Sequence, residues 1–483
     1  MKKVLMIAYF FPPLGGSGVQ RTLKFVKYLP QFGILPVVST VKNGHNFAYD
    51  ESLLEEVPGS VKVYRSSSLE TLWLREALEK IAGLRKGKEE EIPEKVSKDA
   101  QLSEAKSGQK VESEQKAEAD GKGTPEHKDK SEHLPEQKPL KARIFDFIDN
   151  YLFIPDSKVR WLPFGFLKSL QTARRENVDY LFSSSYPYTV HWIARWVHKL
   201  YRRPWIADFR DPWVGNKAMQ KDIPFRKKLD AWMERKVVEE ADYIINVTPS
   251  ITETYKERYP EYADKMVTIT NGYDPVDFAK ATPVKQEKFT LIHTGIIADA
   301  YDMETFADGV RLFLERHPEE RENVQILFIG YVPEHFDALL KRKLGKAYVF
   351  KSYMSHQSVL EYLAGAQLQF MTFDRSVDNA YSGKLFDYIG TGKPILGLLP
   401  EGVAAQLIRE RRLGTVVSLG DIEGLAAAIE RHYNAWQSSA LIPNDLQGPD
   451  SKGSTERCEE FSRVNLAGQL AGLFPASAQG TNN

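Results

Sequence analysis

Apolar and polar positions follow one another along the chain in blocks that predict strands and helices in turn. Val4 to Phe10 is a continuous apolar run, which is typical of a strand covered on both faces of a parallel sheet. A glycine-rich turn then leads to a helix with one apolar stripe over 19–29 and to a second apolar strand over 35–41. This order predicts the start of a doubly wound α/β domain. The same pattern predicts further strands over 61–65, 180–184, 205–209 and 243–248, and helices over 188–201 and 225–240.

The alternation is interrupted between Lys86 and Leu140. This stretch consists mostly of Lys, Glu, Gln, Ser, Asp and Gly, with both charge signs mixed and almost no aromatic residues. Such a composition cannot bury enough apolar area to offset the entropy of ordering. We therefore predict a disordered insertion over 86–140 inside the first domain, because the alternation resumes afterwards. The aromatic segment 143–166 that follows is expected to be buried against the domain, with contact to a membrane surface as the alternative.

A polar stretch from Phe278 to Lys288 predicts a domain boundary, and the alternation of strands and helices then restarts. Strands are expected over 289–293, 324–329, 348–351, 368–373, 395–399 and 414–418, with helices between them. We predict a first domain over 1–278, a second doubly wound domain over 279–440 and a final helix over 454–474.

Composition excludes several classes of function. Lysine plus arginine and aspartate plus glutamate both number 65, so no basic field is available to hold nucleic acid. Cys458 is the only cysteine, which excludes an internal disulfide and a cysteine-rich metal site. Pro12 and Pro13 break the apolar run at the N-terminus, so it is expected to form a strand and turn rather than a signal peptide. We expect a cytoplasmic protein, with attachment to the inner face of the membrane left open.

Candidate chemistry concentrates in residues 379–398, which read NAYSGKLFDYIGTGKPILGL. Ser382 can cap a short helix, and Gly392 can end it in the left-handed conformation before the next strand. The first turn of such a helix presents unpaired N–H groups and the positive end of the helix dipole, to which Lys384 adds a full charge. Asp387 shares a face with Lys384. Amides and a lysine suit a diphosphate and a carboxylate suits ribose hydroxyls; a surface ion pair is the alternative.

Polar loops follow the predicted strands of the first domain. His191 lies one turn into the helix after SSSYPY, and Arg210 and Asp211 come directly after the strand WIADF. In open α/β sheets ligands sit at the carboxyl ends of strands, so these side chains are candidates for a site. A structural histidine and an Arg–Asp pair that braces its own loop are the alternatives.

The turn GGSG carries Gly15 and Gly16, whose lack of side chains would let a ligand approach backbone amides. It does not have the spacing GxGxxG, so a dinucleotide fingerprint is absent. Arg21, in the first turn of the following helix, is expected to be a solvated charge.

Together these stretches resemble the family 4 retaining glycosyltransferases, in a branch with a signature similar to P-S-K-x-F-E-Y. The segments GGSG, SSSYPYTVH, DFRDPW, NGYD and SGKLFDYIGTGKP occur in the family's order, and Pro155, Asp156 and Trp161 fit the segment ahead of them. Asn379 and Asp387 stand where the longer family motif has two glutamates. The signature itself appears as Tyr381, Ser382, Gly383, Lys384, Phe386, Asp387 and Tyr388.

The resemblance implies a GT-B fold, in which two Rossmann-like doubly wound domains face a cleft and the final helix returns to the first domain. It implies retaining transfer of a sugar from a nucleotide sugar to a glycan or lipid-linked acceptor, in cell-envelope or exopolysaccharide biosynthesis. No metal and no further cofactor are expected. The implied catalytic residues are His191, Arg210 and Lys384, and the implied donor-binding residues are Gly15, Gly16, Gly295, Tyr381, Ser382, Gly383, Lys384 and Asp387.

The chain departs from the family after the first strand of its second domain. Many members have an arginine and a lysine there that hold the diphosphate, whereas this chain has no basic residue between Thr294 and Arg311. Arg210 is then a candidate replacement. The departure also leaves open a non-catalytic glycan-binding or scaffold subunit, and a sugar-nucleotide epimerase is a third, disfavoured, interpretation.

Overall fold

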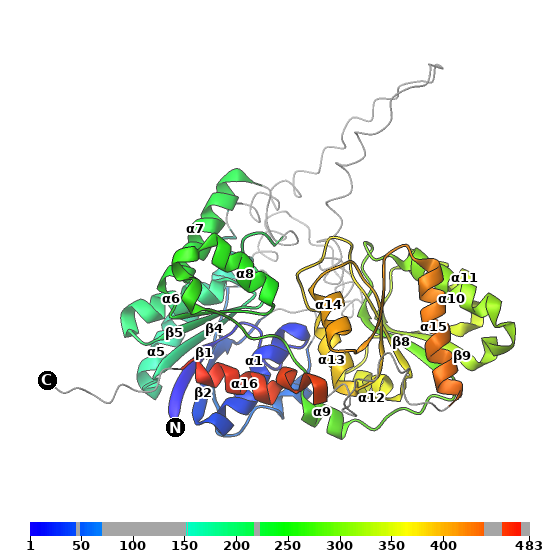
Figure 1. The fold of residues 1–483 in the computed structure, drawn as a ribbon. Coiled ribbons are helices and arrows are strands. Elements are labelled where there is room, and N and C mark those ends of the chain that lie inside the picture. The colour runs from blue at the N-terminus through cyan, green and yellow to red at the C-terminus, as the bar shows by residue number, and fades with distance from the viewer. Residues whose placement is uncertain (45–48, 70–150, 152, 217–222, 439–455, 475–483) are drawn as a thin grey trace, which may run out of the picture.

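The computed structural model describes residues 1–44, 49–69, 151, 153–216, 223–438 and 456–474. Within these residues the chain forms two parallel β-sheets, each with helices on both faces, in two lobes (Figure 1). The expectation of an α/β fold with two doubly wound domains is therefore confirmed. The predicted insertion 86–140 lies outside the described residues.

The first sheet has seven strands in the order β3-β2-β1-β4-β5-β6-β7, and all neighbouring strands are parallel. The direction of strand order reverses between β1 and β4. Its strands are β1 (Lys2–Ile7), β2 (Ile34–Val41), β3 (Lys62–Ser66), β4 (Tyr180–Ser185), β5 (Trp205–Phe209), β6 (Tyr243–Asn246) and β7 (Met266–Thr268). The helices of this part are α1 (Ser17–Tyr28), α5 (Leu162–Glu176), α6 (Thr189–Tyr201), α7 (Pro224–Glu240), α8 (Pro249–Arg258) and the linker helix α9 (Pro275–Lys280).

The second sheet has six strands in the order β10-β9-β8-β11-β12-β13, again all parallel, with the reversal between β8 and β11. Its strands are β8 (Phe289–Ile296), β9 (Val324–Tyr331), β10 (Tyr348–Ser352), β11 (Leu368–Thr372), β12 (Ile395–Leu398) and β13 (Gly414–Val417). Its helices are α10 (Met303–Arg316), α11 (Glu334–Leu344), α12 (His356–Gly365), α13 (Gly383–Thr391), α14 (Val403–Glu410) and α15 (Ile422–Gln437).

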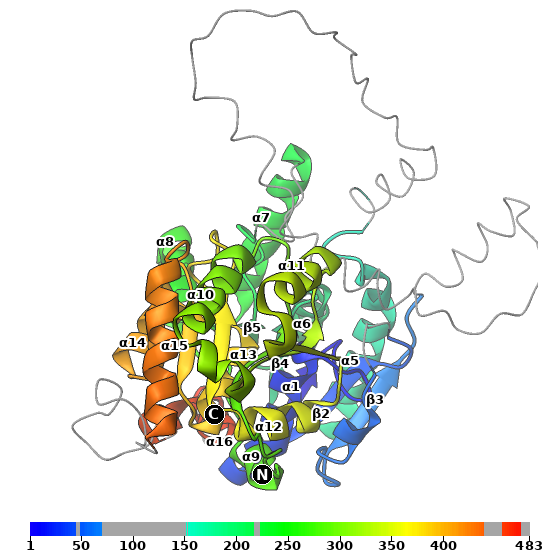
Figure 2. The same cartoon turned by 90° about the vertical axis from the view of Figure 1, so that its right-hand side faces the viewer.

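Alternate residues of each sheet enter separate cores, as the continuous apolar strands require. In β1, Leu5 and Ile7 pack towards α5 and α6, whereas Val4 and Met6 pack towards α16 (Arg463–Gly472). In the second sheet, one face packs against α10, α11 and α15 and the other against α12, α13 and α14. Figure 2 looks onto the side where α10 and α15 lie together.

Most elements lie within a few residues of their predicted bounds, and the differences have local causes. The predicted helix 454–474 is divided: a 3₁₀ segment (Glu456–Phe461) ends before Ser462, whose side chain caps α16. The sequence pattern did not predict two of the helices as distinct elements: α5, which begins at the end of the aromatic segment, and α8. Trp161, just before α5, is completely buried, while Tyr151 is exposed. Among the described residues no helix is long and apolar enough to cross a membrane.

A buried cluster of charges joins the first helix to the linker between the sheets. Lys24 in α1 is 2% exposed, and its Nζ lies 2.5 Å from Glu56, 2.8 Å from Asp274 and 2.7 Å from Asp277. Lys27 adds contacts at 3.0 Å to Glu56 and 2.9 Å to Asp274. Burial alone would raise the pKa of Asp274, but Lys24 and its hydrogen bonds lower that pKa to about 2. The ammonium of Lys24 thus occupies the space among the carboxylates and ties α9 to α1.

The C-terminal segment crosses back beside this linker. Tyr273 donates its N–H to the Phe461 carbonyl at 3.1 Å and accepts at its own carbonyl from Arg463 at 2.8 Å. Helix α16 then packs against α1, and both lie along the lower edge of the first lobe in Figure 1. Among the described residues, the linker and the C-terminal segment thus lie side by side between the lobes.

We predict that Lys24→Met destabilises the protein strongly. The substitution leaves three buried or half-buried carboxylates without their shared cation, and breaking such a buried pair costs about 3–5 kcal/mol. Chemical denaturation monitored by fluorescence measures the loss. Lys280→Met is the matched control, because Lys280 is exposed on the same linker. Equal losses for the two variants would contradict a central role for the cluster.

Candidate functional site

The two reversals of strand order mark the places where ligands bind in doubly wound sheets, at the carboxyl ends of the flanking strands. In the second sheet this is the end of β8 and β11, and helix α13 follows β11. In the first sheet it is the end of β1 and β4, next to the turn GGSG. The residues singled out from the sequence lie at both places.

Helix α13 forms as its local sequence predicts. The Ser382 hydroxyl accepts a hydrogen bond from the Lys384 N–H at 3.2 Å, and Gly392 ends the helix with φ 71°. Leu385, Phe386 and Ile389 are buried on the inner face. These apolar side chains do not cover the first turn of the helix, where Gly383 is exposed.

Lys384 extends from this helix across to the end of β8. Its Nζ donates to the Ile296 carbonyl at 3.2 Å and lies 3.5 Å from His293 Nε2. A β-carbon at Gly295, which has φ 96°, would lie 3.0 Å from Lys384 Cε, so the absence of a side chain there makes room for the lysine. Burial and the nearby Lys384 lower the pKa of His293 well below its ordinary value, so the lysine faces a neutral imidazole. A positive charge thus sits at the switch point of the second sheet.

Asp387 points to a different neighbour from Lys384. Its Oδ1 lies 3.4 Å from Nε2 of His356, the first residue of α12, and 27% of its side chain is exposed. The simple i,i+3 surface pair is therefore not what organises this face, because the lysine contacts β8 and the carboxylate contacts α12. His356 was missed by the sequence analysis, since only the fold brings α12 beside α13.

The remaining donor-binding candidates frame the start of α13. The ring of Tyr381 packs edge-on against Phe386 at 5.8 Å and remains partly exposed. The Asn379 carbonyl accepts a hydrogen bond at 2.9 Å from Thr248 Oγ1, which belongs to the first domain. Because Thr248 follows β6, this bond brings together the carboxyl edges of the two sheets.

Arg210 lies against the glycine-rich turn of the first domain. Its Nη1 would be 2.8 Å from a β-carbon at Gly18, and its Nε contacts Asp211 at 3.3 Å. The side chain is 21% exposed. The structure thus brings Arg210 together with the turn that contains Gly15 and Gly16, although the two motifs are far apart in the sequence.

His191 lies in the core of the first domain. Its ring has no exposed surface, its Nδ1 is 2.8 Å from Ser183 Oγ, and burial lowers its pKa to about 3. Its Nε2 is buried without a hydrogen-bond partner in the described part of the chain. In this conformation the histidine is neutral and inaccessible, so contact with a ligand would require its surroundings to open.

Arg21 corrects a sequence-based expectation, because it is 1% exposed rather than solvated. Its guanidinium donates to both carboxylate oxygens of Asp208, at distances from 2.7 to 3.2 Å, and to the carbonyls of Ile269 and Thr270. Ser184 donates to the same carboxylate at 2.6 Å. Asp208 stands within the otherwise apolar strand WIADF, and that isolated charge was the available signal that a buried cation lay nearby.

Two further buried carboxylates hold the loops beyond β4 and β5. Asp156 accepts from the N–H and hydroxyl of Thr189, both at 2.8 Å, and burial raises its pKa. Glu234 is fully buried and accepts from the Val214 N–H and from the hydroxyl of Tyr255, each at 2.8 Å. These contacts hold the loops at the same edge of the first sheet.

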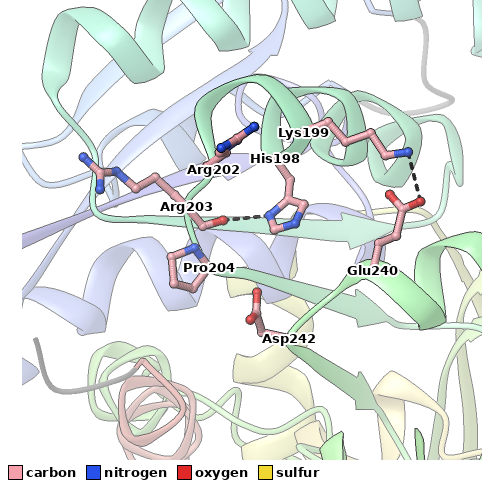
Figure 3. A pocket seen from close by; sticks show the side chains of 7 residues that line it. All are labelled: His198, Lys199, Arg202, Arg203, Pro204, Glu240 and Asp242. Atoms are coloured by element: carbon pink, nitrogen blue, oxygen red, sulfur yellow. Dashed lines mark hydrogen bonds and ion pairs between the residues drawn. The ribbon is translucent and has the colours of Figure 1, made fainter. Parts of the chain in front are cut away.

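A surface pocket of about 510 Å³ lies away from these residues, at the amino ends of β5 and β6 (Figure 3). Several of its charged side chains have partners within the protein. Lys199 Nζ is 3.1 Å from Glu240, and the Asp242 carboxylate accepts a hydrogen bond from the Trp205 N–H at 2.7 Å. It lies at the edge opposite to the one where doubly wound sheets bind ligands. The pocket is lined by His198, Lys199, Arg202, Arg203, Pro204, Glu240 and Asp242.

Comparisons with known proteins bear on the fold and on the first domain. Residues 124–277 match the model of Glycosyltransferase Family 4. No curated protein sequence matches the chain significantly. A glycosyltransferase from Rickettsia africae has a similar structure, with a TM-score of 0.56, 13% identity and coverage of 98% of this chain and 97% of that one.

Two further solved structures illustrate how widely the fold is shared. HepE from Anabaena, in complex with UDP and glucose, gives a TM-score of 0.57 at 12% identity, covering 98% of this chain and 99% of that one. An enzyme described as a UDP-N-acetylglucosamine 2-epimerase from Listeria monocytogenes gives 0.52 at 9% identity, covering 97% and 95%. Likeness at these identities concerns the fold, which transferases and the epimerase share, whereas the family match favours the transferases. The chain thus shares the two-domain fold of these proteins, and residues 124–277 resemble Glycosyltransferase Family 4.

Proposed function

We propose that this protein is a glycosyltransferase that takes a sugar from a nucleoside diphosphate donor, with the donor held on the second domain, and transfers it with retention to a glycan or lipid-linked acceptor. A role in building cell-envelope or exopolysaccharide is part of the proposal. The protein would act in the cytoplasm, where peripheral contact with the membrane would give it access to a lipid-linked acceptor.

The observation that carries the proposal is the position of Lys384. Its ammonium lies over Gly295 at the end of β8, beside the N-terminus of α13. A lysine and the free N–H groups of a helix start form a site for a diphosphate. Solved structures of Anabaena HepE contain UDP and UDP-glucose, which supports a uridine nucleotide as the first donor to test.

The same face of α13 suits the rest of a nucleotide. Asp387 is partly exposed one turn further along, where a carboxylate can accept hydrogen bonds from ribose hydroxyls. Gly330 pairs with Gly295 at the ends of β8 and β9, and a β-carbon there would lie 2.3 Å from the Gly295 carbonyl oxygen, so the glycine lets the two backbones pack closely at this edge.

Catalysis in this proposal is electrostatic. Negative charge develops on the diphosphate as its bond to the sugar breaks, and a preorganised lysine and helix start stabilise that charge. No protein nucleophile is invoked: the acceptor hydroxyl attacks the face from which the diphosphate leaves, which gives retention. Arg210, beside the turn of the first domain, would supply the second positive charge that the loop after β8 lacks.

We predict that Lys384→Ala and Asp387→Asn both weaken binding of UDP, with different responses to salt. Loss of a charge-assisted hydrogen bond costs about 1.5–3 kcal/mol. The effect of Lys384→Ala should shrink between about 0.1 and 1 M salt, where the screening length falls from about 10 to 3 Å. The effect of Asp387→Asn should hardly change, because the ribose is neutral. Titration calorimetry at two salt concentrations measures both.

The controls are Lys393→Ala and Glu322→Gln, which change the same charges at exposed positions away from the start of α13. Asp387→Glu restores the residue of the resembling family and should bind UDP as well as the parent or better. UDP binding that is insensitive to Lys384→Ala would contradict the proposed donor site.

We predict that Gly295→Ala weakens UDP binding more than it destabilises the fold. The new methyl group would meet Lys384 Cε at 3.0 Å and displace the ammonium. Gly420→Ala is the matched control, because Gly420 also has a positive φ, 86°, but nothing lies within 4 Å of its added β-carbon. If both variants lose stability equally and bind UDP equally, the lysine does not depend on Gly295.

We predict that Arg210→Ala lowers turnover of the donor, measured as UDP release, far more than it lowers the melting temperature. The guanidinium is partly exposed and pairs with the neighbouring Asp211, itself an exposed carboxylate, so its loss should cost little stability. Loss of one contact to a phosphate in the transition state corresponds to about 1.5–3 kcal/mol, or roughly ten- to a hundredfold in rate. An unchanged rate would restrict Arg210 to bracing its loop.

A further inference from the structure

The contact between His356 and Asp387 assigns a role to a residue outside the family signature. The imidazole begins helix α12, and its Nε2 lies 3.4 Å from Asp387 Oδ1. About a third of each side chain is exposed, 36% for His356 and 27% for Asp387, so the pair borders accessible space rather than filling a core. A carboxylate has two acceptor oxygens, so a contact at Oδ1 is compatible with a second donor at the other oxygen.

We propose that His356 is a positioning residue for the donor site: it holds the Asp387 carboxylate in the orientation that accepts hydrogen bonds from the ribose hydroxyls. The inference rests on the proposed donor-binding function, and it extends the ribose site to a second helix.

The charges around the pair make the support depend on pH. Burial lowers the pKa of His356, but Asp387 and Asp277 outweigh that effect and the opposing charge of Lys24, so the pKa is raised above its ordinary value of 6.5. The N-terminus of α12 also disfavours a charged imidazole. On the other side, Arg463 of α16 faces Asp387, Asp274 and Asp277. His356 is therefore set between the carboxylates of α9 and α13 and the cations of α1 and α16.

The direction of the pH dependence follows from the raised pKa. A protonated imidazole pairs with Asp387 fully below pH 6.5, and the pairing is lost as pH rises through the raised value. Donor binding should weaken over that rise. UDP-glucose is the suitable probe because its diphosphate is a diester and does not itself titrate near neutral pH.

The test compares the parent, His356→Gln and His356→Ala by calorimetric titration with UDP-glucose from pH 5.5 to 9. The parent should lose affinity with rising pH. His356→Gln keeps an N–H donor, so it should retain much of the affinity but show no pH dependence, whereas His356→Ala should bind about two- to tenfold more weakly below pH 6.5. His317→Gln is the control, because His317 also contacts a carboxylate, Glu430 at 2.9 Å, at the opposite edge of the sheet.

Two further measurements separate a positioning role from a structural one. His356→Ala should leave the affinity for 2′,3′-dideoxyuridine diphosphate unchanged, because that ligand has no ribose hydroxyls. In a double-mutant cycle, His356→Ala should add little to Asp387→Asn. If the parent binds UDP-glucose through Lys384 but shows the same pH profile as His356→Gln, this inference is overturned while the donor site stands. If Lys384→Ala has no effect on binding, or the parent binds no nucleotide, the donor site and the inference fail together.

Discussion

The buried ion pair between Arg21 and Asp208 is the constraint on which the first domain's binding edge depends. Burying either charge alone would be costly, and their bidentate contact, with Ser184 as a further donor, compensates for that cost. The same guanidinium holds the carbonyls of Ile269 and Thr270, where the chain leaves the first sheet. One side chain therefore sets the positions of the loop that carries Arg210 and of the stretch that leads to the second domain.

The second domain is positioned by the two crossings that continue from this point. Lys24 holds the outgoing linker helix, and the backbone bonds of Tyr273 hold the returning segment. Helix α13 packs against both crossings with one face: a β-carbon at Gly390 would collide with Phe278, and Phe386 contacts Phe461 at 5.6 Å. Its other face, with Lys384 and Asp387, is thereby turned towards β8 and α12.

The electrostatics of the donor site follow from which groups remain charged. His293 is neutral because it is buried beside a cation, so Lys384 carries the positive charge at the end of β8. Asp387 is partly balanced by His356 and Arg463, which come from two other helices. The protein thus separates a positive region suited to a diphosphate from a carboxylate suited to neutral hydroxyls, along one short helix.

The parts that the sequence by itself determined are those governed by local chemistry. The apolar runs specified the parallel strands, and the Ser382 cap and Gly392 stop specified α13. The start of α5 was harder to predict from the sequence, because aromatic residues occur both in the irregular stretch before it and in the helix itself. Trp161, just before the helix, is buried in the same core as residues of β1 and α6.

Tertiary structure alone decided which partners meet. Arg21 and Asp208 are 187 positions apart, and an arginine in a first helical turn carries no local sign of its burial. His191 follows a polar loop, yet the packing of α6 on the sheet buries its ring completely. His356 acquires its contact only because α12 lies beside α13. Caps, turns and strands are encoded within a few neighbouring residues, whereas the burial and charge of a site residue are set by groups that only the folded chain brings together.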